Sequence, residues 1–91
     1  MPEDLERRRK RLAFRAWHRG MKELDLLIGG FADRHLDALS PAQLDLFEAL
    51  LDVPEPLMYR WLMGQDPPPP EFDHDVMRLL LSFKYSPQHL D

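Results

Sequence analysis

The 91-residue chain contains no cysteine, so disulfide bonds and thiolate-bound metals are excluded. It also lacks a run of about 20 apolar residues, the length needed to cross a bilayer, and we expect no direct membrane insertion. The first residues have no apolar stretch like that of a secretory signal. Glu3, Asp4 and Glu6 are untypical of a mitochondrial transit peptide, which is poor in acids. These absences predict a cytoplasmic protein.

Motifs for catalysis and nucleotide binding are missing as well. The sequence has no Gly-x-Gly-x-x-Gly fingerprint, no Walker-type loop and no serine in a nucleophile elbow. No pair among the four histidines has the i, i+4 spacing of a helical metal site. We therefore predict no catalytic residue, no metal site and no cofactor-binding residue in this chain.

Charge is distributed unevenly along the chain. Residues 1–23 hold eight lysines and arginines against four acids, a balance of +4, and residues 24–91 hold four against twelve, a balance of −8. The basic end either steers an acidic partner or is a solvated helix face. A helix spreads the charges of Arg7–Arg11 around its circumference, and the rest of the chain would repel a nucleic acid. We expect no nucleic-acid binding.

The apolar pattern is helical, without strand alternation. Asp4 is the expected cap of the first helix, and Ser40 with Gln43 forms an expected capping box. Gly20 and Gly64 stand where helices end in the left-handed conformation. The predicted helices cover about residues 4–18, 21–36, 41–51, 56–63 and 71–84. The predicted fold class is all-α, a compact five-helix bundle in a single domain over residues 1–91.

The apolar stripes of these helices predict which side chains meet in the core. We expect its centre at Leu27, Phe31, Phe47 and Trp61. Phe14 falls opposite the stripe of the first helix; either a second element covers it, which we expect, or it is exposed on the arginine-rich face.

Glycine and proline punctuate two further places. Gly29 and Gly30 interrupt the second helix, which predicts a kink or close helix packing. Pro67–Pro70 predicts a stiff extended linker between helices four and five; the alternative is a docking site for an aromatic-lined groove. The tail over residues 86–91 is expected to be loose.

The run Arg19-Gly20-Met21-Lys22-Glu23 joins the first two predicted helices. Gly20 has no Cβ, so another backbone can approach the turn. Arg19 can make bidentate bonds to a carboxylate or to carbonyls, and Glu23 can orient it or accept bonds itself. In the alternative interpretation Gly20 only stops a helix, and Arg19 and Glu23 form a surface ion pair. The residues alone leave both interpretations open.

Arg-Gly-x-x-Glu after a first helix is typical of the succinate dehydrogenase assembly factor family, which this chain resembles. The resemblance extends to the Leu39-Ser40 helix start, to residues 47–51, and to residues 59–62 followed by Gly64. Together these matches cover about residues 7–83. Two positions depart from the pattern. His18 stands where the family often has another arginine, and Trp17 beside it is unusual.

The resemblance implies a five-helix fold and a non-catalytic chaperone. Such proteins bind the flavoprotein subunit of succinate dehydrogenase, and often that of fumarate reductase. They promote covalent attachment of FAD to a histidine of that partner, so FAD would belong to the partner and not be held tightly here. Arg19, Gly20 and Glu23 would lie in the contact surface by their match to the motif. Their neighbours are predicted to belong to the same surface: Arg15, His18, Met21 and Lys22.

Three other function classes remain open. A general helical adaptor would use the basic end to bind another acidic protein. A small regulatory protein of the antitoxin type is a second alternative, because the same family has also been given that label. An enzyme or direct flavin binder would be recognised by its yellow colour after purification.

Overall fold

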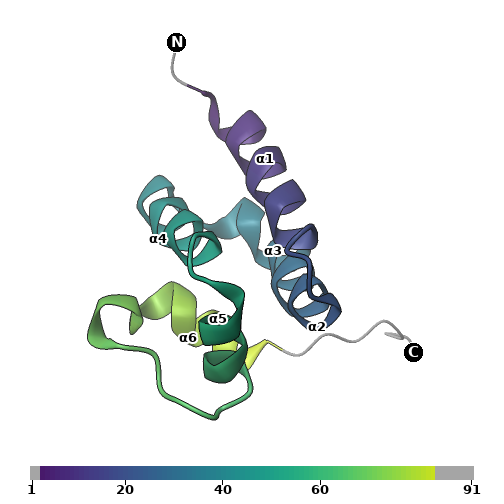
Figure 1. Ribbon diagram of the computed structural model, residues 1–91. Helices are drawn as coiled ribbons and strands as arrows, with labels where there is room; N and C mark the ends of the chain where they lie inside the picture. Colours follow the sequence, from purple (N-terminus) through teal and green to yellow (C-terminus); the bar gives the residue numbers. More distant parts are fainter. Residues whose placement is uncertain (1–2, 84–91) are drawn as a thin grey trace, which may run out of the picture.

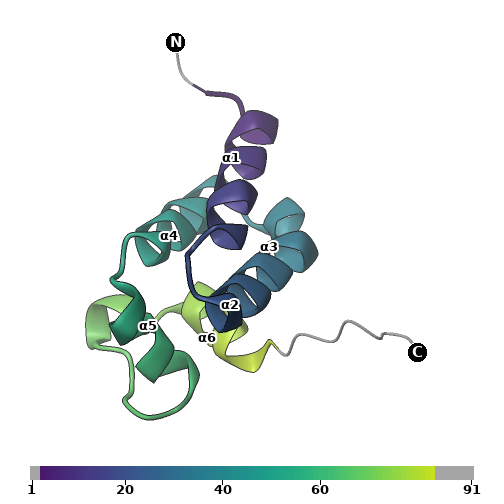
Figure 2. The same cartoon turned by 45° about the vertical axis from the view of Figure 1, so that its right-hand side comes forward.

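The computed structural model describes residues 3–83, which fold into helices without any strand. The first helix, α1, spans Leu5–Trp17 and leads into a second helical segment. Helices α4 (Pro41–Leu51) and α5 (Glu55–Leu62) follow, and α6 (Asp75–Ser82) comes last. Figure 1 shows α4 to one side of α1, and in the turned view of Figure 2 α1 lies between α4 and the second helical segment. The predicted all-α, five-helix architecture is confirmed; the tail over 86–91 lies outside the described residues.

The second helical segment consists of four consecutive parts. It continues in one direction through Gly29 and Gly30, where the sequence allowed a kink (Figure 2). The irregularity is a wider π-type turn just before Gly30, whose N–H points to the carbonyls of both Leu26 and Leu27. The parts are α2 (Lys22–Leu24), the π-helical η1 (Asp25–Gly29), α3 (Gly30–His35) and the 3-10 turn η2 (Leu36–Ala38).

Gly29 allows α1 to approach this segment unusually closely. A Cβ added to Gly29 would lie 2.3 Å from Cδ2 of Trp17, far inside van der Waals contact. The Trp17 ring therefore packs on bare backbone, and its Nε1 donates to Oδ1 of Asp33 at 3.2 Å. The close helix packing that Gly29 predicts is confirmed.

The helix starts expected from capping signals are also confirmed. Asp4 accepts a hydrogen bond from the Arg7 N–H at 2.8 Å. Ser40 Oγ accepts from the Gln43 N–H at 3.1 Å, and Gln43 Oε1 accepts from the Ser40 N–H at 2.9 Å. These reciprocal bonds satisfy backbone donors that no helical carbonyl can reach.

The proline run is extended as far as Pro69 (φ −67°, ψ 164°), and a 3-10 turn, η3 (Pro70–Phe72), follows it. The last helix begins at Asp75, so its predicted start at residue 71 is wrong. His74 caps it instead, because its Nδ1 accepts the Met77 N–H at 3.1 Å. Histidine is not a preferred capping residue, so this helix start was not recognisable from the sequence.

The core is one continuous cluster, to which all the main helices contribute buried side chains. Phe31 and Phe47 are fully buried with ring centroids 5.7 Å apart, and Trp61 is buried beside them in the same cluster. Leu27 is only half-buried, so its predicted place at the centre is wrong. Phe14 is 64% exposed, and the expectation that another element covers it is also wrong.

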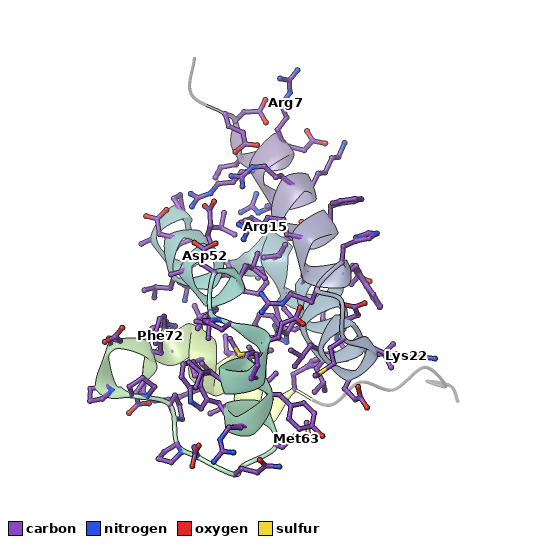
Figure 3. All side chains as sticks on the ribbon, in the orientation of Figure 1. Arg7, Arg15, Lys22, Asp52, Met63 and Phe72 are labelled. Carbon is purple, nitrogen blue, oxygen red and sulfur yellow. The ribbon has the colours of Figure 1, made fainter. Side chains whose placement is uncertain are left out.

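Arginines of α1 pair with acidic residues of α4 along the seam between the two helices. Arg8 and Arg11 both bond to Glu48, at 2.9 and 3.1 Å. Arg15 bonds to Asp52 at 2.8 Å, and Figure 3 shows these two side chains in the space between the helices. Much of the positive charge of the basic end is therefore paired with acidic residues of the same chain.

Two other arginines of α1, Arg9 and Arg7, differ in whether their side chains bond to the rest of the fold. Arg9 donates to the carbonyls of Leu36 and Leu39, at 2.9 and 3.0 Å, and so caps the end of the second helical segment. Arg7 points away from the fold in Figure 3. Only a minor part of the positive charge of α1 is left for a visiting molecule.

No helix within residues 3–83 has both the length and the apolar character required to cross a membrane. In the same range, histidine and acidic side chains nowhere gather in the threes that could hold a metal ion.

Gly29→Ala is expected to lower the free energy of unfolding by about 1–3 kcal/mol, because the new methyl group overlaps the Trp17 ring. Helix propensity alone predicts the opposite sign, a gain of about 1 kcal/mol. Urea unfolding followed by far-ultraviolet circular dichroism measures the difference. In a Trp17→Ala background the same substitution should no longer destabilise; an equal loss in both backgrounds would refute the contact.

Glu48→Gln is expected to reduce the dependence of stability on acid. Hydrogen bonds from Arg8 and Arg11 hold the pKa of Glu48 below its ordinary 4.5. Its contribution is thus complete above pH 4.5 and is lost as the pH falls through the lowered value. Urea midpoints measured from pH 7 downward should fall less steeply for Glu48→Gln than for the parent, and Glu71→Gln should leave the slope unchanged.

Candidate functional site

The chain reverses direction between α1 and α2 in a short, exposed corner. The N–H of His18 bonds back to the carbonyl of Arg15 at 3.2 Å and closes α1. Gly20 then adopts φ +100°, a left-handed conformation that side-chain-bearing residues rarely enter. Met21 is extended, and α2 starts at Lys22. The positive φ predicted for Gly20 is confirmed.

The backbone of this corner is fastened by the acid that ends the run Arg19–Asp25. The Asp25 carboxylate accepts the Arg19 N–H at 2.7 Å, across the corner. Asp25 itself lies in the π-helical turn, directly after α2. The bond fixes the direction in which the second helical segment leaves the corner.

The Arg19 side chain turns inward, where only 5% of it is exposed. Its two terminal nitrogens donate to the carbonyls of Leu51 and Val53, at 2.6 and 3.0 Å. Leu51 is the last residue of α4, so a cation meets carbonyls that the helix leaves unpaired at its negative end. Arg19 makes the bidentate bonds to carbonyls that its chemistry allows, but the carbonyls belong to its own chain.

Glu55 completes the surroundings of Arg19 and was not predicted. Its Oε2 lies 3.9 Å from Nε of Arg19, and its carboxylate also borders Gly20. Burial lowers the pKa of Arg19, because desolvation penalises the charged form, and the Glu55 charge opposes that effect. Nothing in the sequence near position 55 points to the corner, since Glu55 follows Arg19 by 36 positions and Gly20 by 35.

A Cβ on Gly20 would lie 3.6 Å from Oε2 of Glu55, an ordinary contact distance. The requirement for glycine therefore comes from the positive φ and not from a lack of space. Forcing an L-residue into this region costs about 1–2 kcal/mol.

Glu23 has the opposite placement to Arg19. It is exposed on the short helix α2, and no hydrogen bond or ion pair joins its side chain to another of residues 3–83. Lys22 is exposed as well and points outward in Figure 3. The surface ion pair between Arg19 and Glu23 considered from the sequence is not formed; the only carboxylate bridged to Arg19 in this range is that of Glu55.

The remaining predicted contact residues divide between surface and interior. His18 is exposed and stacks on Phe14 with ring centroids 3.9 Å apart. Met21 is half-buried and packs against the core. Arg15 is half-buried, and Asp52 already engages its guanidinium. The accessible edge of the corner thus consists of His18, Gly20, Lys22 and Glu23, which we call the open corner.

Comparison of the sequence with known proteins identifies the family of this chain. Residues 10–84 match the family model described as the flavinator of succinate dehydrogenase. The chain is 39% identical over 79 residues to the FAD assembly factor SdhE of Acetobacter pasteurianus, across 87% of this chain and 72% of that protein.

Two mitochondrial proteins named succinate dehydrogenase assembly factor 2 and 2-A are also similar. The first, from Dictyostelium discoideum, is 35% identical over 77 residues, which cover 85% of this chain and 55% of the relative. The second, from Drosophila yakuba, is 38% identical over 80 residues, with 86% and 49% covered. The chain spans about half the length of these mitochondrial relatives. The resemblance carried by Arg19, Gly20 and Glu23 is confirmed: the chain belongs to the family of flavinators of succinate dehydrogenase.

Proposed function

We propose that this protein is an assembly factor that binds the flavoprotein subunit of succinate dehydrogenase and promotes covalent attachment of FAD to that subunit. Family membership supports the activity. The observation that carries the site is the exposed carboxylate of Glu23, which has no partner in the described part of the chain, on the same corner as the exposed backbone of Gly20. A partner backbone can approach Gly20 closely, and Glu23 can accept hydrogen bonds from it.

Arg19 has an indirect role in this proposal. Its side chain is inside the fold, where it holds the corner against the end of α4. The partner contacts the open corner, and the buried Arg19 side chain stabilises the backbone conformation of that corner. Arg15 contributes in the same way through its bond to Asp52.

The chemistry of flavin attachment is assigned to the partner. FAD and the histidine that receives it both belong to the flavoprotein subunit, and this chain acts as a non-catalytic helper that holds no FAD tightly. Docking at the open corner would hold the flavin domain with the histidine aligned to the isoalloxazine ring. Alignment of two reacting groups can lower a barrier by several kcal/mol without any acid or base from the helper, up to about 7–11 kcal/mol in favourable cases.

Two finer expectations stay predictions. Action on the flavoprotein subunit of fumarate reductase is tested by measuring covalent flavin in that subunit with and without this protein. The cytoplasmic location stays a prediction too, and cell fractionation tests it.

Glu23→Ala is expected to reduce covalent flavin in the succinate dehydrogenase flavoprotein by at least tenfold while leaving the fold intact. An exposed, unpaired side chain contributes within about 0.5 kcal/mol to stability. The measurement is the fluorescence of covalently bound flavin after denaturation, in a strain whose only copy carries the substitution. Glu71→Ala, an exposed acid on η3, is the matched control. Normal flavin content in the Glu23→Ala strain would refute the assignment of the open corner.

Arg19→Ala is also expected to reduce flavinylation, but through a loss of stability of the protein itself. Two carbonyls lose a charged donor, which should lower the free energy of unfolding by about 2–3 kcal/mol. Thermal unfolding followed by circular dichroism separates the two cases, because Tm should fall for Arg19→Ala and stay constant for Glu23→Ala. An unchanged Tm together with lost flavinylation would instead show that Arg19 touches the partner directly.

A further inference from the structure

Phe14 is the most exposed of the large apolar side chains in the described part of the chain, at 64%. It is not a loose ring, because it stacks on His18 one helical turn later, with 3.9 Å between ring centroids and 20° between planes. Phenylalanine is among the residue types that are enriched at the centres of protein–protein interfaces.

A hollow of about 340 Å³ opens beside this stack. It lies between the end of α1 and the connection from α4 to α5. Its walls are partly apolar and partly charged: Phe14, Arg15, His18, Arg19, Leu51, Val53, Pro54 and Glu55. Glu55 also borders Gly20, at 3.6 Å from the position of a Cβ. The hollow is therefore continuous with the open corner.

The exposed His18 ring offers a hydrogen-bond acceptor to a partner at this hollow. Nδ1 of His18 lies 2.7 Å from the Phe14 carbonyl, which can only accept, so Nδ1 carries the proton. In the neutral ring Nε2 is then an acceptor on an exposed side chain. Nε of Arg19, in contrast, is itself buried and has no hydrogen-bond partner among residues 3–83, although its side chain lines the hollow.

We propose that the Phe14–His18 stack and this hollow form a second docking site for the flavoprotein subunit, which takes an apolar side chain from a loop of that partner. The inference rests on the proposed function and extends its contact surface from the open corner along α1. A loop that crosses Gly20 reaches the hollow without leaving the surface, because Glu55 borders both.

The shape and lining of the hollow favour a single side chain over a cofactor. The apolar wall from Phe14 to Pro54 removes such a side chain from water, and His18 can accept an N–H from the backbone that carries it. A volume of about 340 Å³ is at the low end of the ~300–1,000 Å³ that enclose drug-sized ligands. FAD is far larger than such ligands.

The test is the affinity of the purified flavoprotein subunit for the intact chain, measured by isothermal titration calorimetry. Phe14→Ala is expected to raise Kd at least tenfold, because pre-positioned aromatic side chains dominate binding energy. Its Tm should stay within error of the parent, since most of the ring is in water and alanine suits a helix. Phe14→Leu, which keeps an apolar wall, should recover part of the affinity.

Leu5→Ala is the matched control, because Leu5 is a 40% exposed apolar residue on the same helix, away from the hollow. It should bind as the parent does. An unchanged Kd for Phe14→Ala, or equal losses in both variants, would overturn the second docking site. Retention of FAD by the isolated parent chain, lost in Phe14→Ala, would also overturn it by assigning the hollow to the cofactor. If the parent itself does not bind the subunit, the proposed function fails first.

Discussion

The guanidinium of Arg19 ties the end of α1 to the end of α4, and the shape of the surface around Gly20 depends on that tie. A charge removed from water is tolerated only where hydrogen bonds replace its hydration. The carbonyls of Leu51 and Val53 supply those bonds at 2.6 and 3.0 Å. The corner therefore has one favourable geometry, the one that brings these carbonyls within reach, and Gly20 bends the chain into it with a positive φ.

One short motif thus serves two purposes with different residues. Arg19 and the later Asp25 act inward, through bonds that fix the corner. Gly20 and Glu23 remain outside, where the backbone is bare and a carboxylate has no partner within residues 3–83. This division explains why Arg19 and Glu23 form no ion pair although they are only four positions apart in the sequence. The arginine is engaged by carbonyls that come from 32 and 34 residues further along the chain.

The sequence predicted features whose causes are local. Ser40 and the positive φ of Gly20 were recognisable because the bonds and dihedral angles involved span only a few residues. It could not predict which acids would neutralise α1, because Glu48 meets its arginines only after α4 packs there. Phe14 and Glu55 were missed for the same reason. One lies outside the core, the other lies under the corner, and both placements are set by tertiary contacts.

The contact of Trp17 with the bare backbone of Gly29 has a consequence for recognition. Because the Trp17 ring packs directly on the Gly29 main chain, the interface between α1 and the second helical segment resists sliding and tilting. A receptor of this kind presents a preformed template and loses little conformational freedom when it is occupied. Under the proposed function, any structural adjustment on binding must then come from the flavoprotein subunit.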